Sequence, residues 1–226
     1  MFYLNPLYGT DGYKVGHRPM LAPGTTKLYG TWIPRSIKYA PKGITKIVSF
    51  GQQLTWMFIH DLFQEFFFKQ PIDVAVKFSK DMSLYLGMEY EGKHFEELWD
   101  LGYLPIKVKS LPEGIETEPN VPHMTFVNTV DGFAWLTLYL ETIVSNNAWK
   151  PSTAATIAKL YRRNAEKWVY KTDKNNSYLI PFLCHDFSAR GLSGVNDMIS
   201  EGLGHSTSFR GSDTLAVILA SRYYYG

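Results

Sequence analysis

Residues 178–191 read YLIPFLCHDFSARG and residues 209–214 read FRGSDT, and these two stretches indicate the architecture of the chain. The apolar run from Tyr178 to Cys184 does not alternate, which is typical of a strand buried on both faces. Three further elements are predicted after it: a helix at 192–200, a strand at 205–209 and a helix at 214–225. Strands and helices that alternate at this short spacing indicate βα units and a parallel sheet.

The first 150 residues predict a mixture of helices and short strands. Residues 1–43 are rich in Gly, Pro, Tyr and Thr with little periodicity, which indicates loops with short extended pieces. Helices are predicted at 52–69, 74–88, 94–101 and 133–147, and strands at 45–50, 105–111 and 123–128. Another helix is predicted at 152–170, starting beside Pro151. The fold class is therefore α/β, with an α+β region at residues 1–150 followed by an α/β region at residues 151–226.

The composition excludes several classes of protein. The chain has 226 residues, 45% hydrophobic and 15% aromatic, which is enough for a buried core and too apolar for a disordered chain. Its 23 Lys and Arg and 21 Asp and Glu give a formal net charge of +2. A nucleic-acid-binding protein would usually show a stronger basic excess, so we expect no nucleic acid partner.

The distribution of cysteine and apolar residues indicates where the protein works. A single cysteine, Cys184, excludes an internal disulfide framework and a cysteine-based zinc cluster. The most apolar run, residues 56–68, is interrupted by charged and polar residues, so no membrane span is predicted. Residues 1–25 do not contain a basic segment followed by an apolar one, and no signal peptide is expected. We therefore expect a soluble cytoplasmic protein without a membrane partner.

Residue types with functional chemistry gather where the two C-terminal strands are predicted to end. The first end reads HDFSARG (185–191) and the second FRGSDT (209–214). Chemistry in parallel α/β folds sits at the carboxyl ends of strands, so one pocket mouth is predicted here. A flat aromatic ligand with an anionic group would suit it, because Phe187 could stack on the ring and an arginine could pair with a phosphate.

Each of these residues also has a purely structural interpretation. Asp213 or Ser212 precedes an apolar helical run and is equally well explained as its N-cap. His185 and Asp186 could satisfy each other or local backbone groups. Phe187 taken alone would more often be a core residue than a ligand platform. The residues alone leave these alternatives open.

No other motif indicates a chemistry. Residues 201–205, EGLGH, lack the glycine spacing of a dinucleotide fingerprint, and the sequence contains neither a P-loop nor a G-x-S-x-G nucleophile motif. His17, His60, His94 and His123 lie in unrelated segments without metal-ligand spacing, so no metal site is predicted.

Several short motifs, spread in order along almost the whole chain, resemble those of the nicotinamide phosphoribosyltransferase family. Residues 10–17, TDGYKVGH, are similar to the family's T-D-x-Y-K-x-x-H. The other matches are FGQQ (50–53), LPI (104–106), PEG (112–114), WL (135–136), LETI (140–143), HDF (185–187), RG (190–191) and GSDT (211–214). Two departures accompany them: Ser188-Ala189 replaces the family's usual Gly-Tyr, and a charged insertion near residues 34–42 is shorter here.

The resemblance implies a role for five residues in substrate binding. The nicotinamide ring would lie between Phe187 and, from the partner subunit of a dimer, Tyr13. Asp213 would accept a hydrogen bond from the carboxamide NH2 and repel the anionic substituent of nicotinic acid. Arg190 would contact a phosphate, and Asp11 would lie in the pocket segment donated by the partner subunit.

The resemblance also implies that the chain lacks part of the active site. Residues 1–150 would form a dimerisation region, and 151–226 the first βα units of an incomplete TIM-like barrel, which takes about 200–250 residues when complete. Family members continue past this point with the groups that perform the transfer, so we expect no catalytic residue in this chain. The implied cofactors are Mg²⁺ bound with phosphoribosyl pyrophosphate, whose ligands we do not expect in this chain, and ATP.

The leading hypothesis is therefore an N-terminal portion of a nicotinamide phosphoribosyltransferase, inactive by itself. The whole enzyme would join nicotinamide to phosphoribosyl pyrophosphate, giving nicotinamide mononucleotide and diphosphate in NAD salvage. The expected protein partner is a second copy in a homodimer or a complementing C-terminal chain. The alternatives are a non-catalytic nicotinamide-binding or dimerisation module and a nicotinate phosphoribosyltransferase, which Asp213 argues against.

Overall fold

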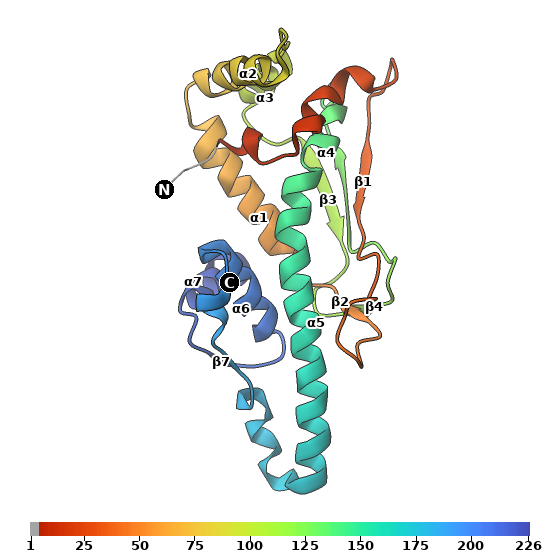
Figure 1. Cartoon of the computed structure of the whole chain (residues 1–226), viewed down its shortest axis with the longest axis vertical. Coiled ribbons are helices and arrows are strands. Elements are labelled where there is room, and N and C mark those ends of the chain that lie inside the picture. The colour runs from red at the N-terminus through yellow and green to blue at the C-terminus, as the bar shows by residue number, and fades with distance from the viewer. Residues whose placement is uncertain (1–4) are drawn as a thin grey trace. The chain divides into compact units, whose positions relative to one another are not determined.

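The computed structural model describes residues 5–226, which form helices and three small sheets (Figure 1). The chain divides into two compact units, each built from three segments. Unit 1 comprises the chain as far as Thr31 together with Trp56–Lys109 and Thr125–Ser145, and unit 2 comprises Trp32–Thr55, Ser110–Met124 and Asn146–Gly226. These units are defined by contacts within the chain, so they do not test the functional boundary expected at residue 150, which stays a prediction.

Unit 1 packs helices around a cluster of aromatic side chains. Phe95 lies at its centre, with its ring centroid 4.9 Å from Phe78, 5.1 Å from Trp135 and 5.3 Å from Tyr139, all edge-to-face. The elements of this part of the chain are η1 (Pro6–Tyr8), η2 (Gly12–Gly16), η3 (Arg18–Met20), β1 (Tyr29–Trp32), α1 (Gln52–Phe63, whose first turn belongs to unit 2), the π-helical turn η4 (Gln64–Phe68), α2 (Asp73–Leu86), α3 (Lys93–Leu101), β3 (Ile106–Ser110), β5 (Met124–Asn128) and α4 (Ala134–Tyr139). The strands form one sheet in the order β1-β5-β3. The helices predicted at 52–69, 74–88 and 94–101 are confirmed.

Unit 2 contains two small sheets and most of the longest helix. Its elements are β2 (Ile47–Val48), β4 (Glu116–Thr117), α5 (Glu141–Thr172, which begins in unit 1), η5 (Lys174–Phe182), β6 (His185–Asp186), η6 (Ser188–Gly191), α6 (Val195–Ser206), β7 (Gly211–Ser212) and α7 (Ala216–Tyr225). Strands β2 and β4 pair antiparallel, with Ile47 opposite Thr117, whereas β6 and β7 pair in parallel. A buried apolar cluster joins α6 and α7 to the first turn of α1; it consists of Leu54, Leu203, Val217 and Ala220.

The break predicted at Pro151 is wrong, because α5 runs through this residue as a single helix (Figure 1). Proline inside a helix normally costs about 3 kcal/mol, so the surrounding contacts must offset this loss. Two side chains one turn apart provide them: Ser152 Oγ donates to Val48 O at 2.7 Å, and Thr156 Oγ1 accepts from Val48 N at 2.9 Å. The Pro151 ring itself packs against the bare Cα of Gly51.

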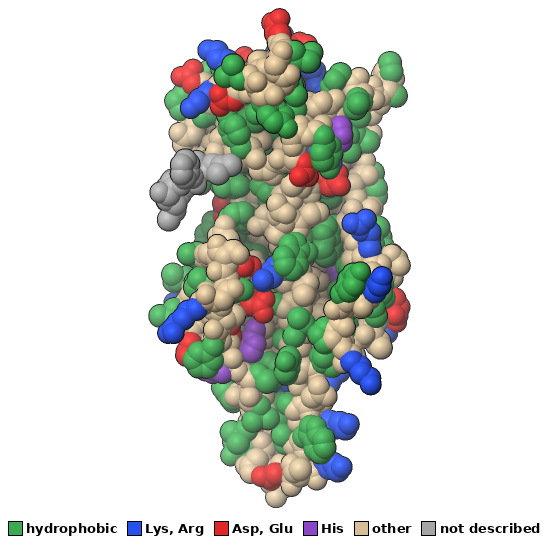
Figure 2. All heavy atoms as spheres, viewed as in Figure 1, with side chains coloured by type: hydrophobic (Ala, Val, Ile, Leu, Met, Phe, Trp, Pro, Cys, Tyr) green, Lys and Arg blue, Asp and Glu red, His purple; other side chains and the backbone are tan. Residues whose placement is uncertain are grey.

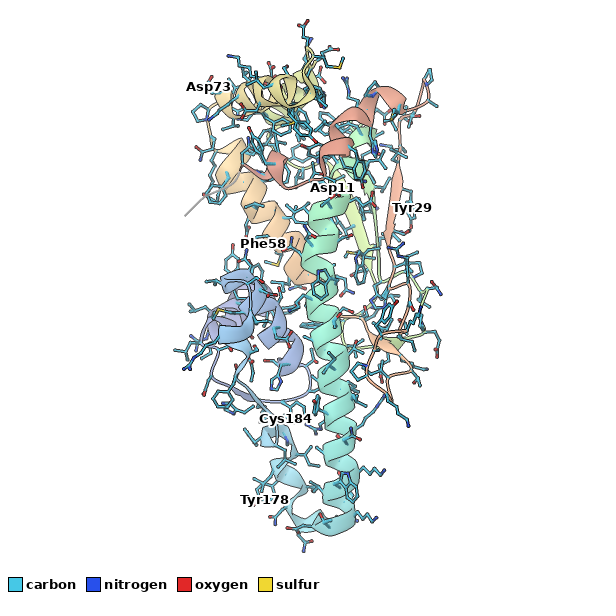
Figure 3. The ribbon with its side chains drawn as sticks, in the orientation of Figure 1. Asp11, Tyr29, Phe58, Asp73, Tyr178 and Cys184 are labelled. Atoms are coloured by element: carbon cyan, nitrogen blue, oxygen red, sulfur yellow. The ribbon has the colours of Figure 1, made fainter. Side chains whose placement is uncertain are left out.

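The strands predicted at 178–184 and 205–209 are also wrong. Residues 174–182 form 3-10 helical turns with a kink at Asn176, and only Ile180 is buried. Other hydrophobic side chains of this segment reach the surface, Tyr178 among them (Figure 2; Figure 3). Pro181 has no N–H to donate to a sheet, and an apolar run without alternation does not specify a period. The observed strands, β6 and β7, begin after each predicted run.

Helix α6 extends to Ser206, six residues beyond its predicted end, because two glycines inside it allow close packing. A Cβ at Gly202 would lie 2.2 Å from Val217 Cγ2, and one at Gly204 would lie 2.6 Å from Ala154 Cβ. Glycine disfavours a helix by sequence, but here these contacts require it. Among residues 5–226, no helix is long and apolar enough to cross a membrane.

We expect Gly51→Ala to destabilise the protein by about 2 kcal/mol. Its φ is +91°, and the new Cβ would lie 2.4 Å from Pro151 Cγ. Gly114→Ala is the matched control in the same unit, because Gly114 has φ +87° but no heavy atom within 4 Å of the new Cβ. The control should lose only the backbone cost, about 1 kcal/mol. Chemical denaturation measures both, and equal losses would contradict the packing role of Pro151.

Candidate functional site

The two polar stretches at the C-terminal end lie next to each other, as predicted. Strands β6 and β7 pair in parallel with His185 opposite Gly211 and Asp186 opposite Ser212. The backbone N–H of Asp213 donates to Asp186 O at 3.0 Å, which extends the pairing by one step. The carboxyl ends of both strands therefore point to the same edge, and their side chains form one site.

The buried side chain of Asp186 connects the two strands at this edge by hydrogen bonds. Its residue is 5% exposed, and its Oδ1 accepts hydrogen bonds from Ser188 N at 2.9 Å and Ser188 Oγ at 2.6 Å. Its Oδ2 accepts from Ser212 Oγ at 2.9 Å, which connects β6 to β7. Burial alone would raise the pKa of this carboxyl, but the hydrogen bonds from Ser188 and Ser212 outweigh it and the pKa is lowered. Asp186 therefore acts in the fold, and its partners are two serines instead of His185.

The neighbours of Asp186 form the exposed side of the site. His185 Nε2 lies 3.1 Å from Asp213 Oδ1, and both side chains are accessible to solvent. The Phe187 ring is 71% exposed, and its centroid lies 4.9 Å from that of His185. An aromatic face, an imidazole and a carboxylate thus meet at the strand ends. Phe187 is therefore not buried in the core of this chain, in contrast to the alternative that it is a core residue.

The N-cap interpretation of the second strand end is also excluded for α7. This helix begins at Ala216, its N-cap is Leu215, and no side chain caps it. Ser212 Oγ instead accepts from Thr214 N at 3.0 Å within the preceding turn. The Asp213 carboxylate is left at the surface, where its hydrogen-bonding partner is His185.

Arg190 lies close in sequence to this cluster, on the short turn η6. Its side chain is exposed, and within the described part of the chain it makes no ion pair. A free guanidinium here is available to an anion, although it does not line the cavity described next.

A cavity of about 410 Å³ opens beside β6, between α5 and α6. Its lining includes His185, Phe187 and three residues that sequence reasoning missed as functional candidates: Cys184, Glu201 and His205. Burial raises the pKa of Glu201 and lowers that of His205, whose Nε2 donates to Gly211 O at 3.1 Å. The i, i+4 spacing of Glu201 and His205 would have revealed this pair had α6 been predicted to continue past residue 200.

Asp11 and Tyr13 belong to unit 1, and they are described separately for that reason. Asp11 Oδ2 accepts from Thr142 Oγ1 at 2.6 Å, at the start of α5. Tyr13 is 62% exposed on η2, with Lys14 Nζ lying 5.2 Å from its ring centroid. Lys14 itself is buried and pairs with Glu141. Both predicted residues thus sit on a turn that is fastened to α5 by polar contacts.

Comparison with solved structures identifies the class of fold. The chain matches human nicotinic acid phosphoribosyltransferase with a TM-score of 0.61 and 19% sequence identity, covering 94% of this chain and 37% of that one. The architecture is therefore a mixed α/β fold of the phosphoribosyltransferase kind. No family model matches the sequence.

Comparison with curated proteins specifies the relatives, and all three described here carry the name nicotinamide phosphoribosyltransferase. The protein of Acinetobacter baylyi is 40% identical over 99% of this chain and 45% of its own length. Those of Mycoplasma genitalium and Xanthomonas campestris pv. campestris are 28% and 26% identical, over 95% and 100% of this chain and 50% and 46% of their own lengths. These matches confirm the resemblance indicated by the motifs. The chain spans about half the length of the curated relatives it matches.

We expect Asp186→Asn to destabilise the protein by about 2 kcal/mol at pH 7, because the amide cannot accept all three hydrogen bonds. The folded-state pKa of Asp186 is lowered, so its contribution is complete above the ordinary aspartate pKa of about 3.9 and is lost as the pH falls through the lowered value. Denaturation of wild type and variant between pH 7 and pH 2 should show the difference shrinking only in acid.

The matched control is Asp213→Asn, an exposed carboxylate on the neighbouring strand end. Its effect on stability should stay within a few tenths of a kcal/mol. Equal destabilisation by the two substitutions would contradict the fastening role of Asp186.

Proposed function

We propose that this chain recognises nicotinamide for the nicotinamide phosphoribosyltransferase reaction, in which nicotinamide and phosphoribosyl pyrophosphate give nicotinamide mononucleotide and diphosphate. The observation that carries the proposal is the exposed Phe187 ring beside the Asp213 carboxylate at the ends of two paired parallel strands. The names of the relatives and the match to a phosphoribosyltransferase fold support the same assignment.

In this proposal Phe187 binds the pyridine ring and Asp213 selects the substituent. Stacking contributes about 0.5–1.5 kcal/mol and does not distinguish an amide from an acid. The Asp213 carboxylate can accept a hydrogen bond from the carboxamide NH2, whereas the carboxylate of nicotinic acid would repel it. For two charges about 4 Å apart at an exposed site, the repulsion is on the order of 1 kcal/mol, which corresponds to about a fivefold change in affinity.

His185 has a positioning role next to Asp213. With its Nε2 3.1 Å from Asp213 Oδ1, the imidazole donates to one carboxylate oxygen and leaves the other for the ligand. The ring also lies alongside Phe187, so it restricts both recognition groups at once. Arg190, with its exposed guanidinium, is the proposed contact for a phosphate, since arginine pairs with phosphate oxygens in a bidentate manner.

We also propose that Tyr13 and Asp11 complete a second subunit's site in a homodimer. The Tyr13 ring is exposed and would stack on a ligand held by another chain, and the turn that carries it is fastened to α5 through Asp11 and Lys14. A fixed turn favours this role, because little conformational entropy is lost when it meets a partner.

The phosphoribosyl transfer itself requires groups beyond those described. Strands β6 and β7, joined by α6 and followed by α7, are proposed as βα units of a TIM-like barrel that further strands, in the same or another polypeptide, would complete. Transfer would proceed by attack of the pyridine nitrogen on an oxocarbenium-like C1, with diphosphate as the leaving group. Bound with phosphoribosyl pyrophosphate, Mg²⁺ would supply charge neutralisation. Residues 5–226 contain no group of three or more His, Cys, Asp or Glu that could hold a metal ion. The use of ATP stays a prediction.

A non-catalytic nicotinamide-binding or dimerisation module is the alternative function. The observation that favours it is the small size of the parallel sheet, which has two strands of two residues each. Binding of nicotinamide is common to both functions, whereas catalysis with a complementing polypeptide belongs to the first alone.

Calorimetry with nicotinamide and nicotinic acid tests the assignment of Asp213. Wild type should bind nicotinamide about tenfold more tightly than nicotinic acid, and Asp213→Asn should remove most of that preference. Phe187→Ala should weaken both ligands by a similar factor, up to about tenfold, because it removes the stacking surface alone. A variant lacking Asp213 that still prefers the amide would refute this assignment.

A complementation assay tests the proposed reaction. The 226-residue chain alone should form no nicotinamide mononucleotide from nicotinamide and phosphoribosyl pyrophosphate with Mg²⁺. Adding a polypeptide that covers the part of the Acinetobacter baylyi relative not matched here should restore synthesis, and Phe187→Ala should reduce it. Turnover by the isolated chain would contradict the proposed division of the site, and binding without any restored synthesis would favour the module.

A further inference from the structure

Unit 1 contains a cavity of about 630 Å³ that the proposed function does not use. It lies among η2, η3, the end of α2, the start of α3 and the start of α4, so all of its walls belong to one unit. Its volume is within the range of small-molecule sites. None of the five residues assigned to nicotinamide or phosphate recognition lines it.

Two buried polar side chains in its wall have atoms without a hydrogen-bonding partner among the described residues. These atoms are His94 Nδ1 and Trp135 Nε1, and each residue is only 3% exposed. Their rings meet edge-to-face with centroids 4.6 Å apart, so the two polar groups share one end of the cavity wall. Leaving a buried donor unpaired costs about 1–3 kcal/mol, which makes two such groups in one wall unusual.

Trp135 offers an N–H to this cavity, and His94 offers a neutral imidazole nitrogen. The indole nitrogen of Trp135 is a donor only. Burial, reinforced by the positive charge of Arg18, lowers the pKa of His94 to about 3, so its ring is neutral with one N–H. Tyr90, in the same wall, is already occupied, because its hydroxyl donates to Val15 O at 3.0 Å.

Arg18 adds a positive charge to the same cavity. Its side chain is half-buried on η3 and makes no ion pair within residues 5–226. Burial raises the pKa of Tyr90 to about 12, and the charge of Arg18 acts in the opposite direction, which places the guanidinium within electrostatic reach of this wall. The indole N–H and a cation thus face the same space, whose lining also includes the apolar side chains Leu21, Leu86 and Met88.

We propose that this cavity binds a small organic monoanion, a carboxylate on an aromatic or aliphatic body, with Arg18 pairing with the carboxylate and Trp135 donating a hydrogen bond. The apolar wall receives the body of the ligand. Glu89 and Glu91 are exposed and also line the cavity, where their charges oppose anions and act most strongly against polyanions such as diphosphate. The site is independent of nicotinamide recognition.

Benzoate, with benzamide as its neutral isostere, is a direct probe. In ¹H–¹⁵N spectra, benzoate should shift the indole N–H of Trp135, a signal assigned by its loss in Trp135→Phe. Arg18→Gln should weaken benzoate binding at least tenfold while the folded spectrum is retained. Arg35→Gln, an exposed arginine of unit 2, is the matched control and should bind benzoate like wild type.

Several outcomes would overturn the proposal. These are equal affinity for benzamide and benzoate, no effect of Arg18→Gln, tighter binding of diphosphate than benzoate, or no shift of the Trp135 signal at about 10 mM benzoate, a concentration at which even a millimolar Kd gives near-saturation. Phe187→Ala should leave the benzoate shift unchanged, so a failure here is distinguishable from a failure of the nicotinamide assignment.

Discussion

The buried carboxylate of Asp186 connects two segments that are 26 residues apart, through Ser188 on its own turn and Ser212 on the neighbouring strand. Successive side chains of a strand point to opposite faces, so the burial of Asp186 turns its strand neighbour His185 outward. Phe187 follows the strand, at the start of η6, and its ring is exposed as well. The exposure of His185 thus follows from the burial of Asp186. A site at these strand ends therefore depends on a residue that does not touch the proposed ligand.

The burial of Asp186 also depends on the close packing of α6 against it. A Cβ at Gly202 would lie 3.0 Å from Asp186 Oδ2 as well as against Val217, so the glycine leaves room for the carboxylate and for α7. Gly202 and Gly204 each reduce the intrinsic helix propensity of α6 by about 1 kcal/mol relative to alanine. The burial of Leu203 and Val217 in one apolar cluster offsets this cost. Helix packing and strand pairing thus support each other around Asp186.

The sequence alone predicted correctly that the HDF and GSDT segments lie side by side, but it misplaced the strands that precede them. HDF and GSDT were expected to meet because polar residues follow two short runs, and they do. The runs themselves were misassigned: residues 178–184 carry no alternation from which a period could be inferred, and Pro151 and Gly204 are helix-disfavouring residues that tertiary contacts retain. The partner of Pro151 is Gly51, 100 residues earlier, and no local pattern contains that information.

Substrate choice also depends on individual side chains more than on the fold. The chain shares its fold with a human nicotinic acid phosphoribosyltransferase, whereas its relatives are named for nicotinamide, so the fold by itself does not discriminate between the acid and the amide. In the proposed function, the discrimination comes from a single side chain at the strand ends. Asp213 is suited to it because His185 engages one carboxylate oxygen and leaves the other to meet the substituent of the ring. An amide supplies the hydrogen that this oxygen can accept, and an acid supplies a second negative charge, so one side chain both attracts the first ligand and repels the second.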